Sequence, residues 1–420
     1  MERLPGFRDF YPEPLPQANV WSAAARQYVF DRWRQTARRY GFRQYDGPPL
    51  EPLELFTLKS GPEIVGQLYN FIDKGDRAVA LRPEMTPTLA RMVAAHHRNY
   101  RKPLKWFAMP QLFRFERHQK GRLKEHFQLN ADILGEAGPA ADAELVALLI
   151  DTLRAFGLTA QDFVVRLSSR SAWTDFFQKR RGAGDPQAGG EKAMQFYQVI
   201  DKLERETPEQ SANALAQLGL SLEQVHQFIQ TAPPTPELAA IVHDLSARGM
   251  AEFVKIDYQV IRGLAYYTGV VFEAFDKKGQ FRAIAGGGRY DNLIRLISQE
   301  KVDMPALGFG MGDVVLLELL KARGLLPALE ESIEAFCIIE DESLRQASLE
   351  LIEHLRTNGY SVDYPLAPAK ADKQLKRALE LKANFTVKLE RSPQGEVMVK
   401  LKNLATHQER IVEPPAPTSP

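Results

Sequence analysis

The chain has a single cysteine, no long apolar run and almost no net charge, and these deficits limit what it can be. Cys337 cannot form an internal disulfide, and zinc sites built from several thiolates are excluded with it. No apolar run approaches the ~20 residues of a membrane-spanning helix, and residues 1–6 lack the apolar core of a signal peptide. We therefore expect a cytoplasmic protein without membrane contact. The net charge of +1 neither favours nor excludes a nucleic-acid partner.

Hydrophobic residues make up 44% and charged residues 25% of the 420 positions, which is typical of a globular protein with two or three domains. Apolar residues at helical spacing predict a helix over residues 17–40, which Gly41 would end. Residues 42–45 predict a strand that Pro48 and Pro49 terminate.

Two neighbouring strands are predicted to form a polar floor. Residues 104–115 and 127–134 have strand composition, and a basic loop at 117–122 joins them. Arg114 and Glu116 share one face of the first strand. In the second, period-2 alternation places three polar side chains on one face: Gln128, Asn130 and Asp132. Such a floor suits a zwitterion and a phosphate, whereas the alternative is a solvated outer face of the sheet.

The composition changes twice along the chain. Residues 172–250 contain a Gly-rich stretch and Gln-rich amphipathic helices, which we interpret as a helical insertion into a domain that spans residues 1–326. From 327 to 412, strands and helices alternate, which predicts a small α/β domain with Cys337 buried in a strand. Residues 413–420 are Pro-rich, and we expect a frayed tail.

The segment 260–269 carries the most specific pattern. Arg262 lies before a glycine, and Tyr266 and Tyr267 follow it. A guanidinium at a glycine-assisted bend, followed by two phenols, suits an anionic substrate group beside a polar ring. The alternative is a structural arginine in an ion pair, next to two half-buried core tyrosines.

Two further patterns bear on a site. Thr86 followed by Pro87 predicts a helix start with Thr86 as N-cap. The glycines at 286–288 lack the spacing of a dinucleotide-binding loop, so we interpret them as positions of close backbone approach.

Three motifs together resemble the histidyl-tRNA synthetases, which are class II aminoacyl-tRNA synthetases. Residues 113–122 resemble motif 2 of this family, residues 262–267 resemble its histidine-binding motif, and residues 81–86 also fit. The resemblance covers nearly the whole chain, with the insertion matching least. It implies an α/β (α+β) fold, in which a class II catalytic domain with an antiparallel sheet core and a helical insertion precedes an anticodon-binding domain. The helix–strand–proline pattern around Pro48 is similar to motif 1 and implies a homodimer.

The resemblance also implies a role for each matching residue. Arg262 and Arg114 would be catalytic, because they would stabilise charge at the α-phosphate of ATP. The residues that would bind histidine are Glu84, Thr86, Gln128, Asp132, Arg262, Tyr266 and Tyr267, of which Asp132 and Tyr267 would read the imidazole. Those that would bind ATP are Arg114, Glu116, Arg122 and His126, the last by stacking on the purine. We expect Mg²⁺ with ATP and no structural metal.

Two positions depart from the family pattern. Ala265 stands where many relatives have an acidic residue, and Val315 stands where the ATP-binding arginine of motif 3 is usual. Arg114, Arg122 and Arg262 are all retained, which favours an active enzyme over a non-catalytic paralogue. The sequence leaves open how the γ-phosphate is held.

The function implied by the resemblance is that of a histidine–tRNA ligase, with histidine, ATP and histidine tRNA as partners. The alternative is a synthetase-like regulatory subunit of ATP phosphoribosyltransferase, a paralogue that generally lacks the C-terminal domain and departs from these motifs. A third possibility, a synthetase-like RNA sensor, belongs to much longer chains. Between Lys370 and Lys402, nine Lys or Arg residues accompany four Asp or Glu residues, which suits a tRNA backbone but is also typical of a solvated helix face.

Overall fold

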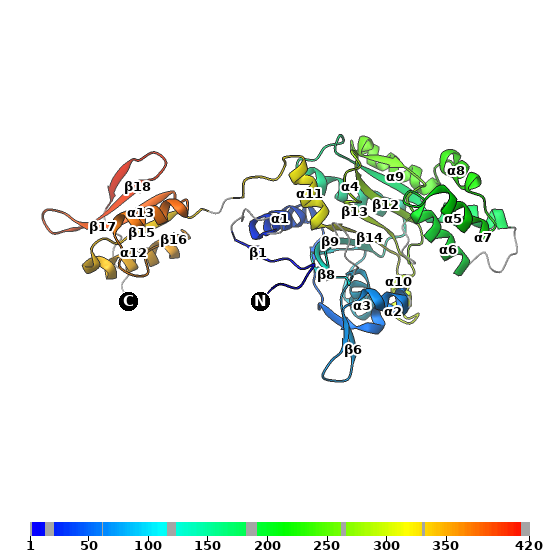
Figure 1. Ribbon diagram of the computed structural model, residues 1–420, viewed down its shortest axis with the longest axis horizontal. Helices are drawn as coiled ribbons and strands as arrows, with labels where there is room; N and C mark the ends of the chain where they lie inside the picture. Colours follow the sequence, from blue (N-terminus) through cyan, green and yellow to red (C-terminus); the bar gives the residue numbers. More distant parts are fainter. Residues whose placement is uncertain are drawn as a thin grey trace. The chain divides into compact units, whose positions relative to one another are not determined.

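The computed structural model describes residues 2–12, 21–60, 62–115, 123–181, 191–261, 266–329 and 332–412. Its contacts divide the chain into two units, Leu15–Pro327 with Met1–Tyr11, and Ala328–Pro420 with Pro12–Pro14. Each unit is built around a sheet of its own (Figure 1). In the described part of the chain, no helix is both long enough and apolar enough to cross a membrane.

A nine-stranded sheet forms the centre of the first unit. Its strand order is β11 (Val254–Ile256), β10 (Phe163–Ser169), β12 (Val270–Asp276), β13 (Ala285–Arg289), β14 (Ala306–Gly312), β9 (Glu125–Leu134), β7 (Leu104–Ala108) and β3 (Arg43–Gln44), with β8 (Gln111–Phe113) also paired to β9. Neighbouring strands are antiparallel except at the two edges, where β10 and β11 pair in parallel, as do β3 and β7. An antiparallel core sheet is what the family resemblance implied.

Strand β9 shows why one face of this sheet is buried while the other is polar. Leu129, Ala131 and Ile133 are at most 2% exposed, and α4 (Pro139–Arg154) packs on β9, β13 and β14. Most of α4 is apolar and buried, so it shields its side of the sheet from water. Residues of opposite parity on β9 point to the other face, namely His126, Gln128, Asn130 and Asp132.

A buried ion-pair network fixes the N-terminal segment against the sheet. The Arg8 guanidinium donates to Glu125 Oε1 at 2.6 Å and to Asp313 Oδ2 at 2.7 Å, and it lies 4.6 Å from the centroid of the Trp21 ring. All three charged side chains are only 1% exposed, and buried charges of this kind are tolerated when each is paired. The network holds the start of α11 (Asp313–Ala322) beside the start of β9.

A smaller sheet stands apart from the large one. It has the order β4 (Leu50–Pro52), β6 (Ala78–Leu81) and β5 (Asn70–Ile72). Around it and the adjoining polypeptide lie α2 (Leu53–Ser60), α3 (Thr86–His96) and α10 (Leu293–Ile297), which contact one another. Short helical turns also occur at Pro62–Gln67 and His97–Asn99.

Helices fill most of the segment that we interpreted as an insertion. They are α5 (Arg170–Arg181), α6 (Glu191–Lys202), α7 (Pro208–Gln217), α8 (Leu222–Thr231) and α9 (Pro236–Ala247), followed by a 3₁₀ turn at Ala251–Phe253. Trp173 is fully buried among aromatic rings, and its indole N–H donates to Tyr258 O at 3.0 Å. Helix α9 packs on α4, whereas α5 to α8 gather at one end of the unit (Figure 1). The predicted Gly-rich stretch at 182–190 lies outside the described residues.

The second unit is a five-stranded α/β sheet in the order β16 (Val362–Asp363), β15 (Ala335–Ile338), β17 (Phe385–Arg391), β18 (Val397–Asn403) and β19 (Glu409–Val412). Helices α12 (Arg345–Thr357) and α13 (Ala371–Glu380) pack on it, and a 3₁₀ turn at Glu342–Leu344 precedes α12. Cys337 is fully buried in β15, as predicted, and burial raises the pKa of its thiol to about 12. The tail predicted at 413–420 lies outside the described residues.

The helix predicted over residues 17–40 is α1, and it spans Ala23–Arg39, so its predicted start is wrong. Trp21 and Ser22 form β2, which pairs with β1 (Phe10–Tyr11), and Ser22 Oγ then accepts from the N–H of Ala25 as the N-cap. The prediction that Gly41 ends the helix is confirmed, because Gly41 adopts a φ of +77° and its N–H donates to Arg38 O. The helix therefore begins later than its apolar pattern suggests.

The strand predicted over residues 104–115 is interrupted. β7 ends at Ala108, and β8 begins at Gln111 after Pro110, which has no N–H to donate to a ladder. Arg114 lies past the end of β8, and Glu116 lies outside the described residues, so the prediction that both share one strand face is wrong for Arg114. The prediction that Thr86 is the N-cap of a helix is also wrong. It is the first residue of α3, with Met85 before it and no side-chain cap.

Candidate active site

Two adjoining cavities open on the polar face of the large sheet. The smaller has a volume of about 70 Å³, and the larger has a volume of about 310 Å³. Both are lined by Arg114, Gln128, Gly286 and Gly310, so these residues mark the junction between them. The alternation of β9 places Asn130 and Asp132 in the smaller cavity and His126 in the larger one. The polar face predicted for this strand is therefore a site lining.

Asp132 lies at the floor of the smaller cavity. Its side chain is 2% exposed, and Tyr290 donates a hydrogen bond to its Oδ1 at 2.6 Å. Burial raises the pKa of Asp132 to about 7, although the hydrogen bond from Tyr290 favours the ionised form. Asp132 Oδ2 and Asn130 Oδ1 are buried without a hydrogen-bond partner among the described residues. Two unsatisfied acceptors in one cavity favour a ligand that brings N–H donors.

Glycines of β14 provide the space for these side chains. A Cβ on Gly308 would lie 1.9 Å from Asp132 Oδ1, and a Cβ on Gly310 would lie 2.7 Å from Cδ of Gln128. Gly308 pairs with Asp132 and Gly310 with Asn130 in the β14–β9 ladder. Any other residue at these positions would displace the polar groups of the floor. The neighbouring glycines at 287 and 288 are equally confined, which confirms close backbone approach at this run.

Residues from three other segments border the smaller cavity. Glu84 and Thr86 come from the start of α3, and the hydroxyl of Tyr266 donates to Glu84 Oε2 at 3.5 Å. Tyr267 is 7% exposed, and its ring centroid lies 4.7 Å from that of Tyr266. Six of the seven residues that the sequence assigned to histidine therefore meet around one cavity: Glu84, Thr86, Gln128, Asp132, Tyr266 and Tyr267.

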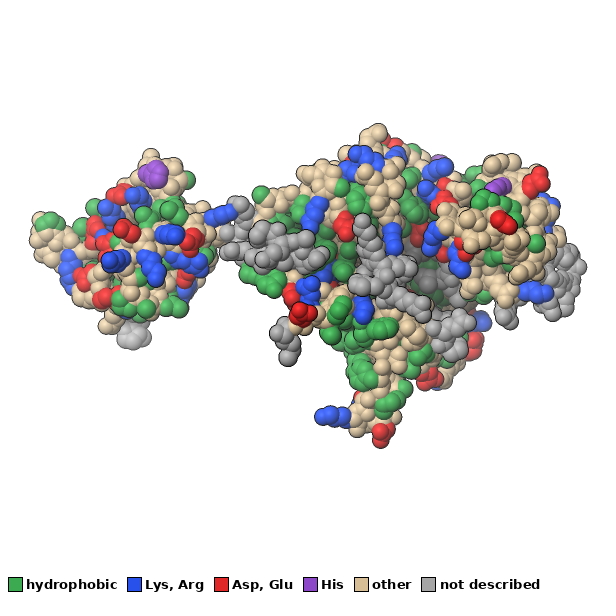
Figure 2. All heavy atoms as spheres, viewed as in Figure 1, with side chains coloured by type: hydrophobic (Ala, Val, Ile, Leu, Met, Phe, Trp, Pro, Cys, Tyr) green, Lys and Arg blue, Asp and Glu red, His purple; other side chains and the backbone are tan. Residues whose placement is uncertain are grey.

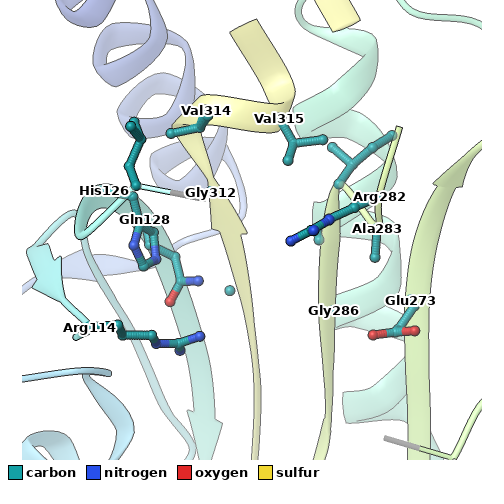
Figure 3. Close-up of a pocket in the computed structure, with 14 residues that line it drawn as sticks. Arg114, His126, Gln128, Glu273, Arg282, Ala283, Gly286, Gly312, Val314 and Val315 are labelled. Atoms are coloured by element: carbon teal, nitrogen blue, oxygen red, sulfur yellow. The ribbon is translucent and has the colours of Figure 1, made fainter. Parts of the chain in front are cut away.

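The larger cavity is bordered from two sides. Arg114, His126 and Gln128 enter from the side of β9, and Glu273 and Arg282 enter from the side of β12 and β13 (Figure 3). Gly312, Val314 and Val315, at the start of α11, also line it. Val315 therefore does lie in this cavity, where an apolar side chain offers no charge to a phosphate.

Arg114 and Arg82 show how differently two nearby arginines are used. Arg114 Nε donates to Pro83 O at 3.1 Å, which orients the guanidinium while leaving its two terminal nitrogens for the cavity. Arg82 is 5% exposed, and its nitrogens donate to Gly47 O at 2.6 Å and Gln111 O at 3.1 Å. Arg114 is thus placed to bind an anion, whereas Arg82 holds backbone segments together.

His126 is uncharged at neutral pH. Burial lowers its pKa to about 3, and the nearby charges of Arg114 and Arg8 act in the same direction. A neutral imidazole on the wall of the larger cavity suits stacking on an aromatic base better than contact with phosphate. The remaining residues that the sequence assigned to the site, Glu116, Arg122 and Arg262, lie outside the described residues, as does Ala265.

Sequence reasoning missed three residues of these cavities. Tyr290 comes directly after the end of β13, two residues beyond its glycine run, whereas Glu273 lies on β12 and Arg282 on the connection to β13. Of the three, only Tyr290 lies near a feature that the sequence had singled out, the glycine run at 286–288. The pairing of β13 with β14 and of β14 with β9 then brings Tyr290 to Asp132. Among the described residues, no group of three or more His, Cys, Asp or Glu side chains is placed to hold a metal ion.

Comparison with known proteins settles the family. The family model for histidyl-tRNA synthetase matches residues 15–313. The chain belongs to the histidyl-tRNA synthetase family. A histidine–tRNA ligase from Opitutus terrae is 43% identical over 433 residues, covering 98% of this chain and 95% of the relative. The chloroplastic/mitochondrial histidine–tRNA ligase of Arabidopsis thaliana is 35% identical over 420 residues, covering 96% of this chain and 83% of the relative.

Solved structures agree on the fold of this synthetase family. Histidyl-tRNA synthetase from Nostoc sp. PCC 7120 aligns with a TM-score of 0.76 at 22% identity, covering 98% of this chain and 96% of its own. A Bacillus halodurans C protein described as an ATP phosphoribosyltransferase regulatory subunit/histidyl-tRNA synthetase aligns with a TM-score of 0.70 at 22% identity, covering 90% and 96%. The predicted class II fold is confirmed. A protein described as a regulatory subunit shares this fold, so the fold does not separate the two functions. The sequence relatives do, because those named above are histidine–tRNA ligases, and they favour the ligase.

Proposed function

We propose that the chain is a histidine–tRNA ligase, which joins histidine to ATP as histidyl-adenylate and then transfers histidine to the 3′ end of its tRNA. The relatives named histidine–tRNA ligase support this at 43% and 35% identity over nearly the whole chain. The observation that carries the proposal is the junction of the two cavities at Arg114 and Gln128. An amino acid in the smaller cavity and ATP in the larger would meet there.

Histidine fits the chemistry of the smaller cavity. The unsatisfied Oδ2 of Asp132 is an acceptor for an imidazole N–H, and Tyr290 holds the carboxylate in place. In the same cavity, Glu84 offers a carboxylate and Thr86 a hydroxyl for the α-ammonium group, and the Gln128 amide is a further polar group of the lining. A polar pocket of this kind selects strongly, because a smaller or apolar amino acid leaves its buried groups unpaired.

Activation is an in-line displacement at the junction. A carboxylate oxygen of histidine attacks the α-phosphorus of ATP, the bond to the β-phosphate breaks, and pyrophosphate leaves. Arg114 presents two N–H groups where charge develops on the α-phosphate, and Arg262 would do the same by its resemblance to the family's catalytic arginine. Holding the reactants in line and stabilising this charge needs no covalent enzyme intermediate.

The rest of ATP would occupy the larger cavity. His126, neutral at physiological pH, suits the adenine ring, and we retain Glu116 and Arg122 as ATP-binding residues on the resemblance alone. Mg²⁺ is expected with the phosphates. Glu273 is the one carboxylate among the described lining residues, and one carboxylate together with phosphates and water is a donor set that Mg²⁺ accepts. The ion would neutralise part of the phosphate charge.

The second unit is proposed to bind the anticodon arm of the tRNA. Fewer side chains of the basic cluster between Lys370 and Lys402 are available to bind phosphate than its composition indicates. Several of its side chains form ion pairs with carboxylates of the same unit, namely Arg377, Lys388, Lys400 and Lys402. Others make no ion pair with a described residue, namely Lys370, Lys373 and Lys376 at α13. We therefore place the phosphate contacts at α13.

The full chain should charge histidine tRNA in an ATP-dependent reaction. Deleting Ala328 to Pro420 should leave histidine-dependent exchange of pyrophosphate into ATP largely intact, because both cavities are built from the first unit. Charging of tRNA should fall strongly, and the lost affinity should be salt-sensitive, as expected for phosphate contacts. Both activities are measured on the two chains at several salt concentrations. Unchanged charging by the shortened chain would contradict a tRNA-binding role for the second unit.

A homodimer is proposed through the region around Pro48. The adjoining small sheet exposes large apolar side chains, since Leu50 is 37%, Phe71 51% and Ile72 63% exposed. Figure 2 shows hydrophobic side chains on the hairpin that β5 and β6 form. Such side chains favour burial against a second copy in an isologous interface. A monomeric mass in solution at micromolar concentration would contradict this. The cytoplasmic location stays a prediction.

A further inference from the structure

Arg282 is a cation of the larger cavity that neither the sequence motifs nor the proposed mechanism uses. It lies on the connection between β12 and β13, on the side of the cavity opposite Arg114. Figure 3 shows its guanidinium pointing into the cavity, towards the side from which Arg114 and Gln128 enter. Two arginines from segments far apart in the sequence, one just past β8 and the other between β12 and β13, therefore approach one cavity.

The connection that carries Arg282 is anchored at its other residues. Arg323, at the end of α11, binds the Asp276 carboxylate and donates to Gln280 Oε1 at 3.1 Å. The Asp276 carboxylate in turn accepts from the backbone N–H groups of Lys278 at 3.2 Å and Gln280 at 2.9 Å. These bonds fix the backbone as far as Gln280, two residues before Arg282, and so reduce the freedom that the connection can lose on binding.

Arg282 itself has no partner in the described part of the chain. No hydrogen bond or ion pair joins it to a described residue, whereas Arg8, Arg289 and Arg323 are each paired with buried carboxylates. An arginine that points into a cavity without a carboxylate partner is suited to an anionic ligand, since its planar fork matches phosphate oxygens.

The start of α11 also borders this side, and the Asp313 carboxylate of its first turn is paired with Arg8. Val314 and Val315 of its first turn line the same cavity, and the N-cap, Gly312, has no side chain to accept from the free N–H groups of that turn. The positive end of a helix attracts anions. Val315 contributes no charge of its own, so Arg282 is the described cation on this side.

We propose that Arg282 binds the β- and γ-phosphates of ATP, the part that leaves as pyrophosphate. The inference rests on the proposed function, because it takes ATP as the occupant of the larger cavity. Arg114 is at the junction with the histidine cavity and would hold the α-phosphate, so the outer phosphates extend away from Arg114 towards Arg282. Arg282 would thereby supply the charge that Val315 does not.

The test compares Arg282→Gln with Lys278→Gln, which removes one positive charge from an exposed position on the same connection. In histidine-dependent pyrophosphate exchange, Arg282→Gln should raise the KM for ATP by about 10-fold or more, as expected for losing a charge-assisted hydrogen bond. The KM for histidine should stay within about 2-fold. Lys278→Gln should match the unmodified chain in both constants. Equal melting temperatures would show that the variants are folded.

A second measurement separates phosphate binding from stacking on adenine. A non-hydrolysable analogue of histidyl-adenylate contains adenine and the α-phosphate but no outer phosphates. Arg282→Gln should bind it as tightly as the unmodified chain does. Equal weakening of ATP and of the analogue, or an unchanged KM for ATP, would overturn the inference. If the unmodified chain itself shows no histidine-dependent exchange, the proposed function fails instead, so the two failures are distinct.

Discussion

Replacing Asp132 with Asn is expected to lower kcat/KM for histidine by about 10³-fold or more, while the KM for ATP stays nearly unchanged. The carboxylate is buried, and its Oδ2 has no hydrogen-bond partner among the described residues, so it is available to the imidazole. An amide in its place can present an N–H to the ring N–H, which leaves two donors facing each other. Asp132 lines the smaller cavity and not the larger one, so the effect should be confined to histidine.

The control for Asp132 is Tyr290→Phe, which keeps the carboxylate and removes the hydrogen bond to Oδ1. A loss of about 10-fold is expected, because the bond positions the carboxylate and favours its ionised form. The pKa of Asp132 is raised to about 7, so in the free protein the carboxyl binds a proton below that pH and is ionised above it. Histidine affinity should therefore fall as the pH drops below 7, and Asp132→Asn should remove this step. Full activity of Asp132→Asn would exclude Asp132 as the imidazole acceptor.

Arg114→Lys is expected to lower the turnover number of adenylate formation by about 10²-fold or more, although the charge is retained. The single ammonium nitrogen of a lysine cannot reproduce the planar fork in which Nε donates to Pro83 O while two other nitrogens, fixed apart from it, face the α-phosphate. The melting temperature should change little, because this side chain borders a cavity. On the resemblance alone, Arg262→Lys should behave in the same way.

Arg82→Lys is the matched control for Arg114→Lys. Arg82 is buried and bridges Gly47 O and Gln111 O, so its replacement should lower the melting temperature while the folded fraction keeps its turnover number. Turnover and melting temperature are measured on the same preparations. A normal turnover number for Arg114→Lys would remove Arg114 from the catalytic residues.

The sequence predicted the site best where one strand carries the signal. Alternation along β9 places Gln128, Asn130 and Asp132 on one face whatever the strand pairs with, and the structure confirms that face. Tyr290 and Arg282 could not be found in this way. They reach the cavities through the pairing of β13 with β12 and β14, which depends on residues far apart in the chain.

The errors at element ends have local causes that the apolar pattern does not record. The pattern continues across Pro110, yet the missing N–H divides the predicted strand into β7 and β8. It also begins before α1 does, because Trp21 and Ser22 pair with β1 instead of joining the helix. The C-terminal strand β19 was not predicted, since its residues are all exposed and carry no alternation of burial.

Pyrophosphate exchange into ATP, run without tRNA and with each amino acid in turn, tests the central claim most directly. The account predicts exchange with histidine and a rate lower by about 10⁴-fold or more with the others, because they leave Asp132 and its neighbours unpaired. A regulatory subunit would bind histidine without catalysing exchange. Absence of exchange with histidine, or a comparable rate with another amino acid, would contradict the account.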